Sequence, residues 1–256
     1  MKKPLILVCN DDGVFAPGIQ ALTSAAEKFG KVVVVAPDKP QSAMGHAITI
    51  NSTLHIRQIE KTENKEIYST SGTPVDCVKL AVNEILDQKP DLIVSGINHG
   101  SNASINVIYS GTMSAAVEGC LEGIPSVGFS LLDFSIDADF SASQHFAEKV
   151  IAHVLENGLQ QGVCLNVNIP KLPLSEIKGI QVCRQANANW EEEFDKRKDP
   201  HGREYFWLTG KFVNYDDGKD TDVFALESNK VSIVPVQIDL TAHHAIKSLE
   251  VLNQDV

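Results

Sequence analysis

The chain has 256 residues, of which 43% are hydrophobic, enough for one large α/β domain or two small ones with a substantial core. Its 33 acidic and 22 basic residues give a net charge of −11, and no stripe of lysine or arginine stands out. This balance disfavours a nucleic-acid polymer as the main partner. Apolar runs reach at most about six residues, far below the roughly 20 that span a bilayer, so we expect no membrane contact.

The amino-terminal stretch MKKPLILV has two lysines before an apolar run, as a short signal peptide does. The run ends at Asn10-Asp11-Asp12 and no small-residue cleavage site follows, so we expect a first strand rather than an export signal. The five cysteines are widely spaced and include no CxxC pair, which favours buried, reduced thiols in a cytoplasmic protein. They are Cys9, Cys77, Cys120, Cys164 and Cys183.

Strand-like apolar runs alternate with helical patterns along the first two thirds of the chain. In chain order we expect a strand at 5–9, a helix at 17–30, a strand at 31–37, an inserted hairpin at 48–59 and 65–71, a helix at 74–86, a strand at 91–96, a helix at 112–123, a strand at 125–131, a helix at 139–157 and a strand at 163–170. Continuous apolar strands suit a parallel sheet covered on both faces. The pattern therefore predicts an open, doubly wound, mainly parallel sheet in a three-layer α/β/α arrangement.

The pattern changes after about residue 180. The stretches GIQVCRQ, REYFWLTG and KVSIVPVQI read as strands without matching helices. We expect one domain over 1–256, with a core at 1–180 and a smaller β-rich extension at 181–256. We interpret the charged stretch EEEFDKRKDPHGRE at 191–204 as an exposed loop, with a binding site as the alternative.

Polar side chains follow three of the predicted parallel strands, where ligands bind in open α/β sheets. Asp11 and Asp12 follow the first strand, Ser42 lies in the loop after the second, and Asn98 follows the strand at 91–96. Neighbouring carboxylates repel unless a cation lies between them, and Gly13 permits a turn that lets both face one ion. These four residues would offer the oxygen ligands that Mg²⁺ or Mn²⁺ prefers. The alternative is that the two aspartates only turn the backbone, and the residues alone leave both interpretations open.

A second candidate site lies at Ser110-Gly111-Thr112, directly before a helix of small residues. Free N–H groups and the dipole at a helix start attract phosphate, although ordinary capping by Thr112 fits as well. His46 and His99 lie in the rim loops and are either substrate contacts or polar surface. No GxGxxG motif follows the first strand, which disfavours a dehydrogenase, and neither a Walker A loop nor a GxSxG motif occurs.

Several long motifs resemble the SurE family, the survival-protein-E nucleotidases. They are NDDGVFAPGIQAL, VVVVAPDKPQSA, SGTPVDCVKLAV, PDLIVSGINHGSN and YSGTMSAAVEG, in the family's order and spacing, with DPHGREYFWLTG and TDVFALESNKVSIVPVQIDLTAH later in the chain. The resemblance covers about residues 4–245. It implies a Rossmann-like fold with a β-rich C-terminal extension, which some members exchange between subunits. A homodimer or homotetramer is therefore implied as well.

The resemblance also implies a metal-dependent phosphatase that acts on nucleoside monophosphates at the 5′ or 3′ phosphate. One divalent ion per subunit, such as Mg²⁺ or Mn²⁺, would be held by Asp11, Asp12, Ser42 and Asn98, and Asp11 or Asp12 would also handle the proton of the attacking water. We expect phosphate or nucleoside contacts from Asn10, Asn102, Ser110, Gly111 and Thr112. A non-catalytic nucleotide-binding or signalling module is the alternative.

Two segments depart from the family pattern. Residues 103–106 (Ala-Ser-Ile-Asn) lack the usual glycine and acid, and residues 227–230 (Glu-Ser-Asn-Lys) lack the usual glycine-tyrosine. We expect the first change to alter the flexibility of its loop and the substrate preference. Neither change affects a proposed metal ligand.

Overall fold

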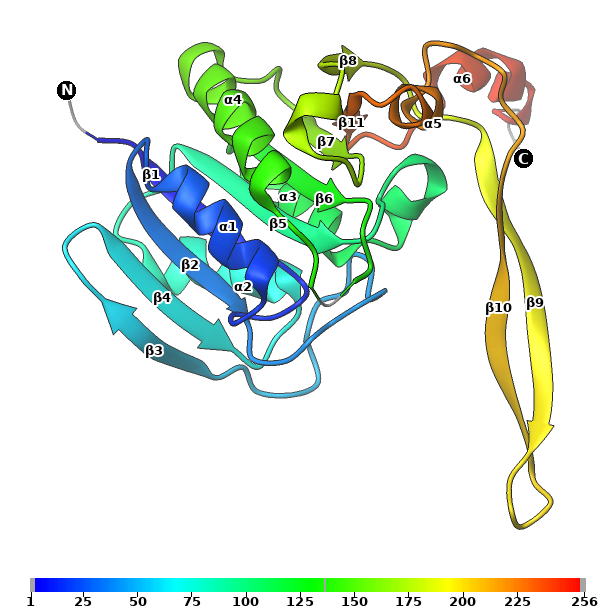
Figure 1. Cartoon of the computed structure of the whole chain (residues 1–256), viewed down its shortest axis with the longest axis horizontal. Coiled ribbons are helices and arrows are strands. Elements are labelled where there is room, and N and C mark those ends of the chain that lie inside the picture. The colour runs from blue at the N-terminus through cyan, green and yellow to red at the C-terminus, as the bar shows by residue number, and fades with distance from the viewer. Residues whose placement is uncertain (1–2, 136, 254–256) are drawn as a thin grey trace.

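The computed structural model describes residues 3–135 and 137–253, and its centre is a nine-stranded sheet (Figure 1). The strand order across the sheet is β3-β4-β2-β1-β5-β6-β7-β11-β8. The strands are β1 (Leu5–Cys9), β2 (Lys31–Pro37), β3 (Ile56–Lys61), β4 (Lys65–Thr70), β5 (Leu92–His99), β6 (Ser126–Leu131), β7 (Val163–Ile169), β8 (Ile180–Val182) and β11 (Val231–Gln237). Within the described chain, no helix is long and apolar enough to cross a membrane.

The six central strands, from β4 to β7, run parallel to one another. β1 lies between β2 and β5, with Leu7 in register with Val33 on one side and Ile93 on the other. Antiparallel pairing is confined to the flanks, where β3 pairs with β4 and β11 pairs with β7. The doubly wound, mainly parallel α/β fold is therefore confirmed, and the parallel strands bring their carboxyl ends to one edge.

Helices cover both faces of the sheet and make the three expected layers (Figure 1). The helices of these two outer layers are α1 (Pro17–Ala26), α2 (Pro74–Leu80), α3 (Gly111–Leu121) and α4 (Ser141–Asn157). Alternate residues of β1 face opposite layers, because side chains alternate along a strand. Ile6 and Val8 belong to the core formed with α1 and α4, whereas Leu5 and Leu7 belong to the core formed with α2 and α3.

Side chains cap the starts of α2 and α3. α2 begins with a capping box: the Thr73 hydroxyl accepts from the Asp76 N–H, and the Asp76 carboxylate accepts from the Thr73 N–H. α3 is capped by Ser110, whose hydroxyl accepts from the Met113 N–H, so capping by Thr112 was wrong by two residues. The expected helix ends were also too long, since α1 stops at Ala26, and α2 passes into a π-helical turn at Ala81–Ile85.

The inserted hairpin is shorter than expected. β3 begins only at Ile56, and residues 48–55 are irregular, although their alternating pattern resembles a strand. Ile48 and Ile50 are exposed, so no buried face fixes this stretch in a sheet. It forms part of the long connection between β2 and β3, which carries Ser42.

The stretch at 191–204 is not a loop. Residues Ala188–Lys198 form β9 and Glu204–Asn214 form β10, an antiparallel hairpin that projects away from the rest of the molecule (Figure 1). Short helices also occur in this part of the chain, at α5 (Asp222–Glu227) and α6 (His243–Leu249), where none were expected. Short 3-10 helices occur at Ser104–Ile108, Leu174–Glu176 and Glu250–Leu252.

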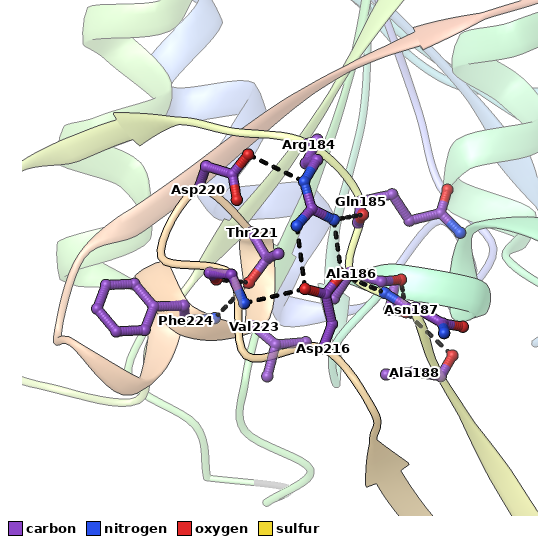
Figure 2. Close-up of polar contacts among 12 residues, drawn as sticks. Arg184, Gln185, Ala186, Asn187, Ala188, Asp216, Asp220, Thr221, Val223 and Phe224 are labelled. Atoms are coloured by element: carbon purple, nitrogen blue, oxygen red, sulfur yellow. Dashed lines mark hydrogen bonds and ion pairs between the residues drawn. The ribbon is translucent and has the colours of Figure 1, made fainter.

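The base of the hairpin is fastened by an arginine (Figure 2). The Arg184 guanidinium donates two hydrogen bonds to the Asp216 carboxylate, at 2.6 and 3.0 Å, and a third to Asp220 at 2.9 Å. This fork keeps the pKa of the Asp216 carboxyl well below its usual range. The contacts hold the two ends of the hairpin together and fix it against the segment that leads into α5.

Candidate active site

A cavity of about 770 Å³ opens beyond the carboxyl ends of β1 and β5. It is lined by all four proposed metal ligands, Asp11, Asp12, Ser42 and Asn98. Of the other residues proposed to contact the substrate, it is also lined by Asn102 and Ser110. The sheet therefore places residues from three separate loops around one space, as the strand ends predicted.

Asp11 is buried at the end of β1 and is held by the start of α3. The Thr112 hydroxyl donates a 2.6 Å hydrogen bond to Oδ1 of Asp11. A Cβ on Gly111 would lie 2.6 Å from the Asp11 Cβ, so only glycine lets the helix approach this closely. Burial raises the pKa of Asp11 to about 6; the Thr112 hydrogen bond lowers it, and the neighbouring charge of Asp12 raises it further.

Asp12 faces the loop that follows β5. Its Oδ2 atom lies 3.4 Å from the backbone nitrogen of His99 and 3.4 Å from the His99 Nδ1 atom. The His99 ring packs edge-on against Phe140, with ring centroids 4.9 Å apart. Asp12 is less buried than Asp11, so the two carboxylates have different environments on the same turn.

Asn98 is aimed by an irregularity in β5. The pairing with β6 shifts by one residue between Ser95 and Asn98, as in a β-bulge, which re-aims the side chains that follow. A Cβ on Gly18 would lie 2.0 Å from the Ile97 carbonyl oxygen, so α1 packs directly on this backbone. The Asn98 amide nitrogen donates to the Gly100 carbonyl at 2.9 Å. This assigns the amide nitrogen to the loop and leaves the amide oxygen as the atom for a ligand.

Ser42 is exposed on the connection after β2, and hydrogen bonds from its neighbours place this connection. The Gln41 N–H donates to the Asp11 carbonyl at 2.8 Å, and the Gly45 N–H donates to the Tyr109 carbonyl at 3.2 Å. His46 does not line the cavity; its Nε2 atom lies 2.9 Å from the Glu118 carboxylate on α3. The connection is therefore fastened to both β1 and α3.

The remaining predicted substrate residues have different surroundings. Asn10 does not line the cavity; its amide donates to the Gly13 carbonyl and accepts from the Gly13 N–H, which shapes the turn of the two aspartates. Gly111 and Thr112 lie behind Asp11 rather than on the cavity wall. Asn102 lines the cavity, and its amide donates to Ser130 at 2.8 Å. Direct substrate contact by these residues remains a prediction.

One wall of the cavity is apolar, and the sequence did not predict it. This wall includes aromatic and aliphatic side chains from five separate segments: Tyr109, Leu132, Phe134, Trp190, Phe212, Val223 and Leu226. The Trp190 indole donates to the Asn106 side-chain oxygen at 2.8 Å and packs edge-on against Phe212. Trp190 and Phe212 lie at the base of the β9–β10 hairpin, so the segment after residue 180 contributes to the cavity. No spacing in the sequence connects these residues.

Across residues 3–135 and 137–253, no group of three or more histidine, cysteine, aspartate or glutamate side chains could hold a metal ion. A metal at the cavity would therefore rest on Asp11 and Asp12 together with neutral oxygens, as the sequence predicted. Such a set suits a hard divalent cation better than zinc, which takes nitrogen and sulfur ligands.

Comparison with known proteins identifies the family. A model of the family described as Survival protein SurE matches residues 6–192. The chain belongs to the SurE family. The 5′-nucleotidase SurE of Christiangramia forsetii is 67% identical over 97% of this chain and 96% of its own length. The 5′-nucleotidase SurE of Flavobacterium psychrophilum is 64% identical over 97% of each chain. The crystal structure of the SurE protein from Aquifex aeolicus matches with a TM-score of 0.86 at 39% identity, covering 98% of this chain and 100% of that one.

The segment at 103–106, which departs from the usual SurE pattern, is firmly held. The Ser104 N–H donates to the buried Asp222 carboxylate at 2.7 Å, and the Ser104 hydroxyl donates to the carbonyls of Ala186 and Ala188. Asn106 accepts from Trp190 as described. In this SurE-family chain the loop after Asn102 is therefore tied to the C-terminal segment, which reduces its freedom.

Proposed function

We propose that this chain is a metal-dependent 5′-nucleotidase, which releases phosphate from nucleoside 5′-monophosphates and also from 3′-monophosphates. The observation that carries the proposal is the meeting of Asp11, Asp12, Ser42 and Asn98 at one cavity. The names of the relatives from Christiangramia forsetii and Flavobacterium psychrophilum, both 5′-nucleotidase SurE, support the same activity. Mg²⁺ or Mn²⁺, one ion per subunit, is the proposed cofactor.

The residues at the cavity fit such an ion. Asp11 and Asp12 are consecutive, so their charges repel, and the charge of Asp12 raises the pKa of Asp11. A divalent cation between them would remove that repulsion. The Asn98 amide nitrogen is already occupied by the Gly100 carbonyl, which leaves an oxygen toward the ligand. When bound, the ion would lower the pKa of a water and neutralise charge on the phosphoryl oxygens.

We assign separate roles in the reaction to the groups around the cavity. The Thr112 hydroxyl holds one oxygen of Asp11 and so fixes the orientation of that carboxylate. Asp12 is the more accessible acid, and we assign it the proton of the attacking water. The first turn of α3, capped by Ser110, carries N–H groups that no helical carbonyl accepts. The positive end of the helix dipole favours a phosphate beside Ser110, which lines the cavity.

The proposal extends to the assembly and its location. The β9–β10 hairpin projects into solvent with exposed apolar side chains at Phe194, Phe206, Trp207 and Leu208. We propose that it packs against, or is exchanged with, a second copy of the chain in a cytoplasmic homodimer or homotetramer. Light scattering that reports only monomer at micromolar concentration would refute this part without affecting the proposed reaction.

Phosphate release from a panel of nucleoside monophosphates tests the proposal. Phosphate release is expected in the presence of Mn²⁺ or Mg²⁺. It is expected to disappear with EDTA and to return when the metal is restored. Asp12→Asn is expected to lower kcat by at least about a hundredfold, as loss of a proton acceptor does. Nucleotide binding without phosphate release under every metal condition would instead indicate a non-catalytic nucleotide-binding module.

A further inference from the structure

Phe134 is a mostly exposed aromatic residue on the wall of the cavity. Its exposed fraction is 81%, compared with 52% for Tyr109 and 43% for Trp190, which line the same space. It lies in the connection between β6 and α4. An isolated exposed phenylalanine needs no explanation by itself, but this one lines the same cavity as the proposed metal ligands.

One side of the Phe134 ring rests on bare backbone. A Cβ on Gly100 would lie 2.2 Å from Cε1 of the ring and 2.6 Å from Cζ. Gly100 also has a φ of +102°, which favours glycine. Both the close approach of the ring and the backbone conformation therefore require glycine at position 100. The missing side chain lets the Phe134 ring lie against the backbone, while most of the ring surface stays exposed.

The backbone under Phe134 is held on both sides. The preceding residue, Asp133, is buried and accepts 2.9 Å hydrogen bonds from the Lys171 ammonium and from the Ser135 N–H. The Leu132 N–H donates to the Ile169 carbonyl at 2.9 Å. The ring therefore stands on a fixed support, so little order would have to be gained when a flat ligand binds to it.

The end of β5 and the residue that follows it carry both ends of the site. The Gly100 carbonyl, next to the Phe134 ring, accepts from the amide of Asn98, the proposed metal ligand. The intervening residue, His99, faces Asp12. A ligand whose phosphate lies at Asp12 and Asn98 therefore has an open aromatic surface beside it along the loop.

We propose that Phe134 is the platform on which the base of the nucleotide stacks, a specificity-determining contact that rests on the proposed nucleotidase function. Every nucleobase has a π-face that stacks on an aromatic ring without hydrogen-bond readout. The contact selects nucleotides over other phosphomonoesters, and purines, with their larger face, over pyrimidines. It makes no demand on the reacting phosphate.

Steady-state kinetics with two substrates tests the platform. For Phe134→Ala, the KM for AMP is expected to rise about tenfold, in line with the loss of one base–aromatic stack, with kcat within about twofold. Ribose 5-phosphate has no base, so its kcat/KM is expected to stay unchanged, which also shows that the variant is folded. Phe134→Trp keeps an aromatic surface and is expected to retain a low KM for AMP. Phe15→Ala is the matched control, because Phe15 is 72% exposed and does not line the cavity.

Each contrary result has a distinct meaning. An unchanged KM for AMP in Phe134→Ala overturns the platform, as does an equal loss of kcat/KM for AMP and ribose 5-phosphate. A rise in the KM for AMP with Trp190→Ala but not with Phe134→Ala also overturns it, and assigns the base to the hairpin side of the cavity. A wild-type chain that hydrolyses neither compound with metal refutes the proposed function itself.

Discussion

The Thr112 hydroxyl donates a 2.6 Å hydrogen bond to Oδ1 of Asp11, which joins the first turn of α3 to the end of β1. Both side chains are buried, and Gly111 removes the side chain that would otherwise separate them. The helix that prepares a phosphate site thus also fixes the first proposed metal ligand. A disturbance at this junction is expected to change metal binding and catalysis together.

Thr112→Val removes the hydrogen bond while nearly preserving the shape of the side chain. The buried carboxylate loses a donor, which is expected to lower the free energy of unfolding by about 1–3 kcal/mol. Because the Thr112 hydrogen bond lowers the pKa of Asp11, its loss is expected to raise that pKa further and to weaken Mn²⁺ binding. Urea unfolding and calorimetric titration measure the two effects.

Thr112→Ser is the control for this prediction, since it keeps the hydroxyl and removes only a methyl group. Its metal affinity is expected to stay close to that of the wild-type chain. Wild-type Mn²⁺ affinity in Thr112→Val would show that the orientation of Asp11 does not depend on this donor.

The raised pKa of Asp11, about 6, predicts a pH dependence of metal binding. A folded-state pKa above the unfolded value means that the metal-free protein binds this proton more tightly than the unfolded chain does. The protonated Asp11 carboxyl therefore stabilises the folded, metal-free protein below about pH 4, and this stabilisation is lost as the pH rises through about 6. A cation must displace the proton, so Mn²⁺ affinity is expected to fall about tenfold per pH unit below 6 and to level off above about 7. Titration calorimetry from pH 5 to 8 measures this, and a flat profile would contradict it.

The parts predicted from sequence are those in which local pattern and tertiary environment agree. The run at β1 is continuous because both faces are buried, and Asp11 and Asn98 follow strands whose ends meet at one edge by geometry. β10 was expected from the stretch REYFWLTG, whereas β9 was missed because its side chains lie largely in solvent, so no apolar alternation marks it. Phe134 and Trp190 were missed because only the folded chain brings them together.

The His46–Glu118 contact, at 2.9 Å, holds the connection that carries Ser42 against α3. Burial raises the pKa of the Glu118 carboxylate, but its contacts with His46 and Lys79 together outweigh burial and hold the pKa below its usual value. His46→Ala is expected to speed amide hydrogen exchange at residues 42–47 and to weaken metal binding several-fold, because Ser42 loses its support. Mass-spectrometric exchange gives the first quantity and calorimetry the second.

Lys79→Met is the matched control, because it removes the other partner of the same carboxylate without contact to the connection. Exchange at 42–47 is expected to stay near the wild-type rate in this variant. Equally faster amide exchange at 42–47 in both variants would show that these residues depend on the stability of α3 as a whole and not on the His46–Glu118 contact.

Asp222 ties the loop after Asn102 to the C-terminal segment, and its substitution is expected to loosen the apolar wall of the cavity. Its buried carboxylate accepts from the N–H groups of Ser104, Ala186 and Val223 at 2.7 to 2.9 Å. The Ser104 and Ala186 N–H groups donate to different oxygens of this carboxylate, and Asp222→Asn replaces one of the two oxygens with an NH2 group. A buried N–H is then left without an acceptor, which is expected to lower the free energy of unfolding by about 1–3 kcal/mol. Asp220→Asn is the control, because that side chain is exposed and its ion pair is with the half-exposed Arg184, so little change is expected. Urea unfolding followed by tryptophan fluorescence measures both variants, and equal stability of the two would contradict the role of Asp222.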